Sequence, residues 1–126
     1  MKRILYVEDE PSFQALVQIM LEREDFLVDV ADNGAEGVRQ AEAVPYDLIL
    51  MDLNMPVLDG FEATRALKAT QAYRAVPIVA VTGLTSPALI DKAYGAGICD
   101  YIAKPFKRNQ LVDLVYKHLA LATCEE

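Results

Sequence analysis

The stretch Leu48-Ile49-Leu50-Met51-Asp52 consists of four consecutive apolar residues followed by an aspartate. A continuous apolar run of this length is typical of a strand that is buried on both faces, as strands are in a parallel sheet. Two further runs have the same form. Residues 4–7 are followed by Glu8, and residues 78–81 are followed by Thr82. We therefore expect three buried strands, each with a polar residue at its carboxyl end.

The segments between these runs have the pattern of helices. After the first run, apolar residues recur at helical spacing and predict a helix with a buried stripe, made by Phe13, Leu16, Val17 and Met20. Asp59 and Ser86 are expected to cap two later helices with their side chains. Gly95 and Gly97 should end the second of these helices, because glycine readily adopts the left-handed conformation found at helix ends.

Strands and helices alternate along the whole chain. Residues 26–31 and 99–103 are expected to form the remaining strands, and residues 107–121 the last helix. This order predicts an α/β protein with a flavodoxin-like, doubly wound (βα)5 fold, whose five-stranded parallel sheet has the strand order 2-1-3-4-5. The length of 126 residues suits one domain, which we expect at residues 1–122, with a short C-terminal tail at residues 123–126.

Charge and composition disfavour several classes of protein. With 12 basic and 19 acidic side chains the net charge is −7, which argues against direct binding to nucleic acid. No apolar stretch is long enough to span a bilayer and the N-terminus lacks the pattern of a signal peptide, so we expect a cytoplasmic protein without membrane insertion. Cys99 and Cys124 form no CxxC motif, and we expect Cys99 to be buried. We expect His118 on the surface of the last helix.

Polar side chains follow the apolar runs, and the carboxyl ends of parallel strands meet at one edge of a sheet. We therefore expect a group of polar residues to converge there: Glu8, Asp9, Asp52, Thr82 and Lys104. Three carboxylates at close range repel one another, and a divalent cation relieves this repulsion. Because the donors are oxygen atoms, Mg2+ is the expected metal, with Mn2+ as the alternative.

A carboxylate beside a magnesium ion and a lysine is suited to phosphoryl transfer, since the transferred group needs positive charge and hydrogen-bond donors around its oxygens. Asp52 follows the expected central strand and is the best candidate for the nucleophile. Glu8 and Asp9 would hold the metal. Lys104 and Thr82 would each contact a phosphoryl oxygen.

Four segments resemble the motifs of response-regulator receiver domains in two-component signalling systems. Residues 48–60, LILMDLNMPVLDG, are similar to the phosphoacceptor region, and residues 6–10, YVEDE, to the acidic pair. Residues 79–83, VAVTG, resemble the segment with the switch threonine, and residues 100–106, DYIAKPF, resemble the lysine-proline-aromatic signature. The similarity extends over nearly the whole chain. All four motifs in this order, each at an expected strand end, form a specific combination.

The resemblance implies a phosphoryl-accepting switch that is not a conventional enzyme. Asp52 would take the phosphoryl group from a sensor histidine kinase or a histidine phosphotransfer protein, and the main-chain carbonyl of Asn54 would join the metal ligands. Thr82 would move toward the phosphoryl group and Tyr101 would turn inward. The surface of the fourth helix, the fifth strand and the fifth helix would then change and engage a downstream effector protein. The resemblance leaves open whether phosphorylation also drives the formation of a homodimer.

The resemblance also implies a cis peptide bond between Lys104 and Pro105, and space at Gly83 for the phosphoryl group to enter. Other functions fit parts of the pattern. A degenerate receiver would bind its partners without phosphorylation, and a receiver excised from a hybrid kinase would carry the same motifs, although Met1 and the short tail favour a stand-alone protein. A haloacid-dehalogenase-type phosphatase is disfavoured because Asn54 stands where its second aspartate is expected. A flavin carrier is disfavoured because the acidic loop after the first strand would repel a phosphate.

Overall fold

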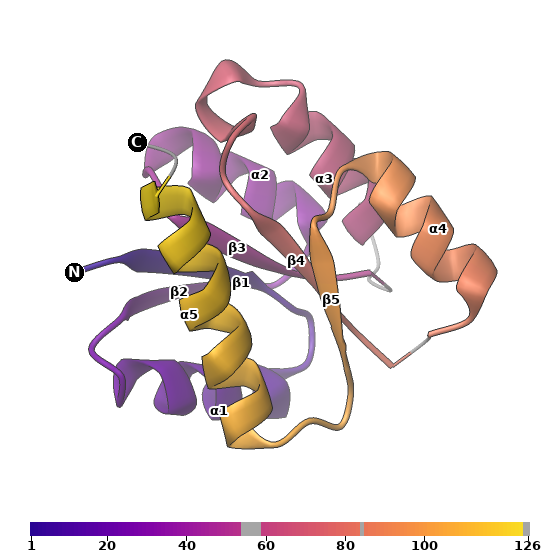
Figure 1. The fold of residues 1–126 in the computed structure, drawn as a ribbon. Coiled ribbons are helices and arrows are strands. Elements are labelled where there is room, and N and C mark those ends of the chain that lie inside the picture. Colours follow the sequence, from indigo (N-terminus) through magenta and orange to yellow (C-terminus); the bar gives the residue numbers. More distant parts are fainter. Residues whose placement is uncertain (54–58, 84, 125–126) are drawn as a thin grey trace.

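The computed structural model describes residues 1–53, 59–83 and 85–124, and for residues 120–124 it describes the backbone alone. Strands and helices alternate in these ranges, as the sequence predicts (Figure 1). In chain order the elements are β1 (Arg3–Val7), α1 (Pro11–Glu22), β2 (Leu27–Ala31), α2 (Gly34–Ala43), β3 (Leu48–Asp52), α3 (Gly60–Lys68), the short 3-10 helix η1 (Gln71–Tyr73), β4 (Ile78–Thr82), α4 (Pro87–Ala96), β5 (Asp100–Ala103) and α5 (Arg108–Cys124).

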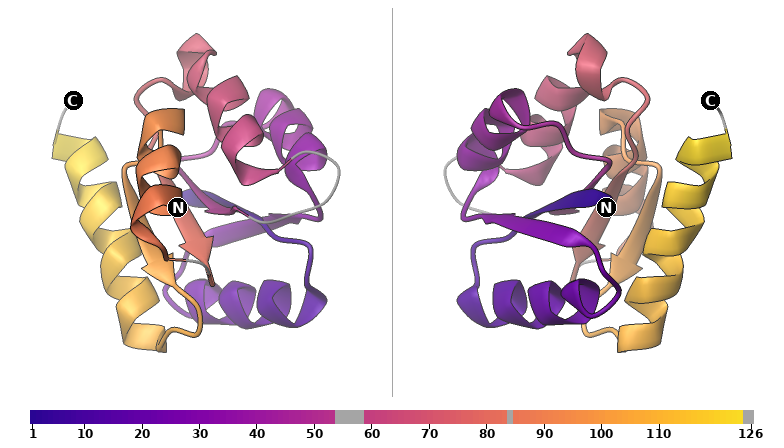
Figure 2. Two further views of the ribbon diagram at one scale, coloured as in Figure 1. Left: turned by 90° about the vertical axis from the view of Figure 1, so that its right-hand side faces the viewer. Right: turned by 90° about the vertical axis from the view of Figure 1, so that its left-hand side faces the viewer.

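The strands form one parallel sheet in the order β2-β1-β3-β4-β5, which confirms the predicted flavodoxin-like arrangement. The pairing register aligns Val7 with Met51 and Asp52 with Val81. The carboxyl ends of β1, β3 and β4 therefore lie close together at one edge of the sheet. Helices α1 and α5 cover one face of the sheet, and α2, α3 and α4 cover the other (Figure 2).

The core consists of two apolar layers, one on each face of the sheet. Successive residues of a strand point to opposite faces, so Leu5 and Val7 pack against α2 and α3 while Ile4 and Tyr6 pack against α1 and α5. Every residue of β3 and β4 is buried. These central strands form a fully buried base for the side chains at their carboxyl ends.

The helix ends agree with most of the predicted caps. Asp59 accepts a hydrogen bond from the backbone N–H of Glu62, and Ser86 does the same for Leu89. Gly97 ends α4 with a φ of 123°, a left-handed conformation that favours glycine. The prediction that Gly95 also ends this helix is wrong, because the helix continues to Ala96.

The predicted buried stripe of α1 is partly wrong. Val17 is buried and Met20 packs against the core, but Leu16 is 43% exposed. Phe13 is half-buried and turns toward the carboxyl edge of the sheet, where it contacts Lys104. The helix rests on the sheet through a narrower face than the sequence spacing indicates.

Two predictions near the edge strand β5 are also wrong. His118 is buried, and its Nε2 lies 2.9 Å from Asp100 Oδ2. Cys99 is exposed, and its Sγ lies 3.7 Å from His118 Nδ1. The cause is the position of β5 at the side of the sheet, where α5 covers one side of the strand and solvent reaches the other.

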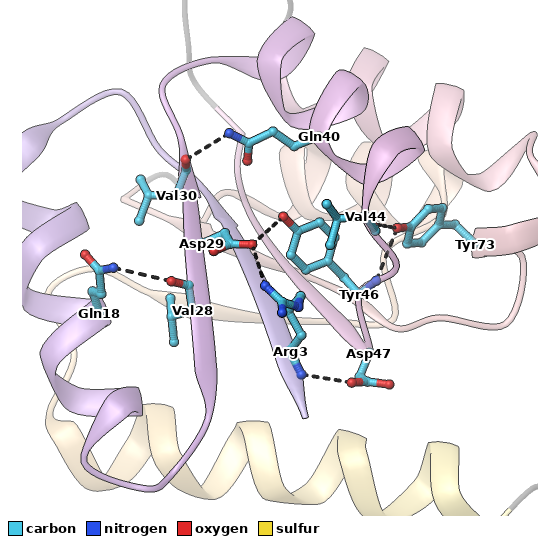
Figure 3. Close-up of polar contacts among 10 residues, drawn as sticks. All are labelled: Arg3, Gln18, Val28, Asp29, Val30, Gln40, Val44, Tyr46, Asp47 and Tyr73. Atoms are coloured by element: carbon cyan, nitrogen blue, oxygen red, sulfur yellow. Dashed lines mark hydrogen bonds and ion pairs between the residues drawn. The ribbon is translucent and has the colours of Figure 1, made fainter. Parts of the chain in front are cut away.

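A polar network lies at the end of the sheet where β1 and β3 begin, away from the carboxyl ends of the strands (Figure 3). Asp29 Oδ2 accepts hydrogen bonds from the Arg3 guanidinium at 3.2 Å and from the Tyr46 hydroxyl at 2.7 Å. The backbone N–H of Arg3 donates to Asp47 at 2.8 Å, and the backbone N–H of Tyr46 donates to the Tyr73 hydroxyl at 3.3 Å. We call these five residues the amino-edge network.

Within the part of the chain that the structure describes, no helix has both the length and the apolar character needed to cross a bilayer.

Candidate functional site

A cleft of about 350 Å³ lies at the carboxyl ends of the strands. The structure brings together in its lining five residues that the sequence singles out, which we call the carboxyl-edge site: Glu8, Asp9, Asp52, Thr82 and Lys104. They come from the ends of β1, β3 and β4 and from the segment after β5. The remaining lining residues are Glu10, Phe13 and Gly83. Residues as far apart in the sequence as Glu8 and Lys104, 96 positions, thus meet in one small cleft.

Three carboxylates form an acidic group in this cleft. Glu8, Asp9 and Asp52 each offer one oxygen, and these oxygens lie within 4.8 Å of one another. Glu8 is 1% exposed and Asp52 is 6% exposed, whereas Asp9 is open to solvent. A set of hard oxygen donors with one solvent-accessible side suits a small divalent cation that keeps some of its water ligands. The residues present therefore fit a metal ion of the magnesium type.

Lys104 is the cation of the site. Its Nζ lies 2.6 Å from Glu8 Oε1 and 3.7 Å from Asp52 Oδ2. The same ammonium lies 4.4 Å from the centroid of the Phe13 ring, a favourable cation–π distance. The backbone N–H of Lys104 also bonds to the carbonyl of Thr82 at 2.8 Å, which extends the pairing of β4 and β5. The lysine is thus held against both buried carboxylates.

The protonation of Glu8 follows from its hydrogen bonds. Burial acts to raise the pKa of Glu8, but hydrogen bonds from Lys104 and from the Tyr6 hydroxyl outweigh it and hold the pKa below its ordinary value. Burial raises the pKa of Tyr6, and the neighbouring Glu8 carboxylate raises it further. Tyr6 therefore remains a protonated donor and Glu8 an ionised acceptor. At Asp9, desolvation and the proximity of Glu8 raise the pKa.

The other predicted residues take different positions. Thr82 is buried at the end of β4, and Gly83 beside it is exposed. Tyr101 on β5 is 37% exposed and does not line the cleft. The peptide bond between Lys104 and Pro105 is cis, as predicted. Asn54, whose carbonyl is expected to bind the metal, lies outside the described residues.

The sequence pattern does not find two residues that contact the site. It places Tyr6 in an apolar run and Phe13 in a core stripe, whereas Tyr6 contacts Glu8 and Phe13 contacts Lys104. The signal for Tyr6 was present, because residues i and i+2 of a strand share a face and Tyr6 stands two positions before Glu8. No comparable signal points Phe13 toward Lys104, since the two residues are far apart in sequence and meet only when β5 is in place.

The fold and the acidic cleft with its opposed lysine define a class of protein, the receiver modules of phosphoryl signalling. Comparison with known proteins supports this class. A family model described as response regulator receiver domain matches residues 4–116, and the chain belongs to this family.

Individual relatives support the same conclusion. The solved receiver domain of sensor histidine kinase PA1611 from Pseudomonas aeruginosa PAO1, described with a magnesium ion coordinated in its active site cleft, is 39% identical, with a TM-score of 0.89 over 94% of this chain and 98% of that one. Vibrio cholerae chemotaxis protein CheY4 is 30% identical, with a TM-score of 0.91 over 94% of this chain and 98% of that one. The signal transduction histidine-protein kinase BarA from Shigella flexneri is 34% identical over 91% of this chain.

The chain spans only part of the curated relatives it matches. The aligned region is 12% of BarA, 17% of a Vibrio cholerae sensor kinase and 45% of the Bacillus subtilis regulator ResD. The chain is thus homologous to the receiver domains of both response regulators and sensor kinases.

Proposed function

We propose that the chain is a phosphoryl-accepting signalling switch whose acceptor is Asp52. The observation that carries the proposal is the acidic group at the carboxyl ends of β1 and β3, with Lys104 beside Asp52 and Glu8. The donor would be a phosphohistidine of a sensor histidine kinase or of a histidine phosphotransfer protein. A carboxylate oxygen of Asp52 would form the new bond to phosphorus, while the bond from phosphorus to the histidine nitrogen breaks and the nitrogen keeps the electron pair.

The neighbouring residues supply what the transfer needs. Glu8, Asp9 and Asp52 would hold Mg2+, or Mn2+, with the main-chain carbonyl of Asn54 as a further ligand. The ion would supply positive charge that offsets the repulsion between the carboxylates and the phosphoryl oxygens. Lys104 would donate to a phosphoryl oxygen. These residues would assist a reaction on the chain itself, and we do not propose turnover of a separate substrate.

The change of shape would begin at the end of β4. The Thr82 hydroxyl would donate to another phosphoryl oxygen, and Tyr101 would leave its half-exposed position and turn inward. Phosphorylation would then favour a second arrangement of the surface formed by α4, β5 and α5, where Tyr94 is also exposed. A downstream effector protein would recognise this surface, and a phosphorylation-dependent homodimer would use the same one.

Several expectations from the sequence belong to the same proposal. The receiver domain would comprise residues 1–122 and the tail residues 123–126. The protein would act in the cytoplasm and would bind neither nucleic acid nor a membrane directly. Cell fractionation and an affinity screen with DNA fragments and lipid vesicles would test these points.

A second candidate function is favoured by the curated relatives, because the chain matches only a small part of some of them. Because the match to BarA covers only 12% of that kinase, the same domain could work inside a sensor kinase and pass its phosphoryl group to a phosphotransfer protein. Loss of label from the chain to an added histidine phosphotransfer protein would support this relay role over a terminal switch.

The decisive experiment is the intact mass of the chain after incubation with acetyl phosphate. The wild type should gain one phosphoryl group when Mg2+ is present and none in excess chelator. Asp52→Asn should gain none, because an amide is not a nucleophile here. Asp29→Asn is the matched control, since Asp29 is an aspartate of β2 outside the cleft, and it should be labelled like the wild type. Labelling of Asp52→Asn, or of the wild type in chelator, would overturn the assignment.

A further inference from the structure

Tyr6 lies within the buried strand β1, yet its hydroxyl reaches the Glu8 carboxylate of the carboxyl-edge site. Its ring packs in the apolar layer beneath α1 and α5 and is fully buried. Its Oη donates a hydrogen bond to Glu8 Oε1 at 2.6 Å. The pleat of β1 places the two side chains on one face, so the contact follows from the strand itself.

The two oxygens of the Glu8 carboxylate have different surroundings. Oε1 accepts hydrogen bonds from the Tyr6 hydroxyl and from the Lys104 ammonium, each at 2.6 Å. Oε2 accepts a longer bond from the backbone N–H of Glu10 at 3.3 Å. Two short bonds to one oxygen fix the plane of the carboxylate.

We infer that Tyr6 is a positioning residue, whose hydroxyl holds Glu8 in the orientation that binds the divalent cation. The inference rests on the proposed function, because it assumes that Glu8 is part of the metal site. When Lys104 moves to a phosphoryl oxygen, the phenol keeps Oε1 bonded and the carboxylate in place. Without the phenol, the orientation of Glu8 would depend on the lysine, and the cation would lose a prepared ligand.

The test is the affinity for Mg2+ measured by isothermal titration calorimetry on Tyr6→Phe. The change removes one oxygen and keeps the ring that fills the core. We expect the affinity to fall about tenfold, the size typical for loss of a group that orients a metal ligand. Tyr46→Phe is the matched control, because Tyr46 is also buried and its hydroxyl also donates to a carboxylate, that of Asp29, at 2.7 Å. Its affinity for Mg2+ should equal that of the wild type.

Phosphorylation by acetyl phosphate provides a second measure. Tyr6→Phe should need more Mg2+ for half-maximal rate but reach the same rate at saturating Mg2+, since Asp52 and Lys104 are unchanged. A fall in the maximal rate with an unchanged Mg2+ requirement would contradict the inference. So would an effect of Tyr6→Phe on affinity that persists undiminished in a Glu8→Gln background, because that outcome would indicate a general effect on the core.

The wild type offers a test that does not depend on how the variant folds. The ring 13C signals of Tyr6 should shift in step with Mg2+ binding, while those of Tyr46 stay constant. Static Tyr6 signals would overturn the inference. Failure of the proposed function itself would look different, since the wild type would then bind no Mg2+ or take no phosphoryl group.

Discussion

The two ends of the sheet are built from similar residues but differ in charge, with two carboxylates and one arginine at the amino edge and three carboxylates and one lysine at the carboxyl edge. In the amino-edge network, one arginine and one tyrosine hydroxyl share Asp29, and the bonds are made within the chain. In the carboxyl-edge site, three carboxylates face a single lysine. The first edge is organised to stabilise the fold. The second keeps an excess of negative charge, as expected where function competes with stability.

The ion pairs at the two edges also differ in how deeply they are buried. The side chains of Arg3 and Asp29 are more than a third exposed, so water screens their ion pair. Lys104 and Glu8 are almost completely enclosed, and the same interaction is therefore stronger and more costly to break. Comparable substitutions at the two edges should therefore change the free energy of unfolding by different amounts.

The largest effect is expected for Lys104→Met. It leaves the buried Glu8 without its ammonium, and the free energy of unfolding in chelator should fall by about 3 kcal/mol. Urea unfolding measures this loss, part of which Mg2+ should restore. The control at the other edge, Arg3→Met, should lose less than about 1 kcal/mol because its ion pair is partly exposed. Equal losses at the two edges would contradict the comparison.

A change from aspartate to asparagine should have opposite effects at the two edges. Asp29→Asn weakens the bonds from Arg3 and Tyr46 and should lower the free energy of unfolding by about 1–2 kcal/mol. Asp52→Asn removes one of three repelling charges and should raise it by about 1 kcal/mol in chelator. Thermal unfolding of the two variants beside the wild type is sufficient. A destabilised Asp52→Asn would mean that Lys104 already balances the site.

The smallest effect concerns Asp100 on β5. Burial acts to raise the pKa of Asp100, but the hydrogen bond from His118 and the nearby positive charge of Lys117 hold it below the ordinary value of 3.8. Because the folded pKa is the lower one, the stabilisation exists above the ordinary value and is lost as the pH falls through the folded pKa. The wild type should exceed Asp100→Asn by about 1 kcal/mol near neutral pH. Urea unfolding at a series of pH values should show this gap narrowing below about pH 4, and a constant gap would refute the assignment.

The fold could be predicted because its signals are local. The apolar runs of β1, β3 and β4, and the caps at Asp59 and Ser86, depend on neighbouring residues alone. The errors occur where the outcome depends on distant parts of the chain. His118 is buried because α5 lies over Asp100, and Gly95 remains helical because Gly97 supplies the turn.

The candidate site was predicted for a related reason. The parallel sheet brings every strand end to one edge, so a list of the residues after each apolar run is already a list of neighbours. This rule finds the carboxylates, Thr82 and Lys104. It does not find Tyr6, which lies inside a strand, or Phe13, which reaches the cleft from a helix. The rule identifies groups at strand ends and misses residues inside a strand or on a helix that contact those groups.

The ion pair between Lys104 and Glu8 joins residues 96 positions apart. Since a chain is synthesised from its N-terminus, all three carboxylates leave the ribosome well before the lysine that opposes them. The acidic group therefore gains its internal counter-charge only when the segment after β5 has reached the ends of β1 and β3. The last strand therefore completes the sheet and also brings the lysine of the cleft to its three carboxylates.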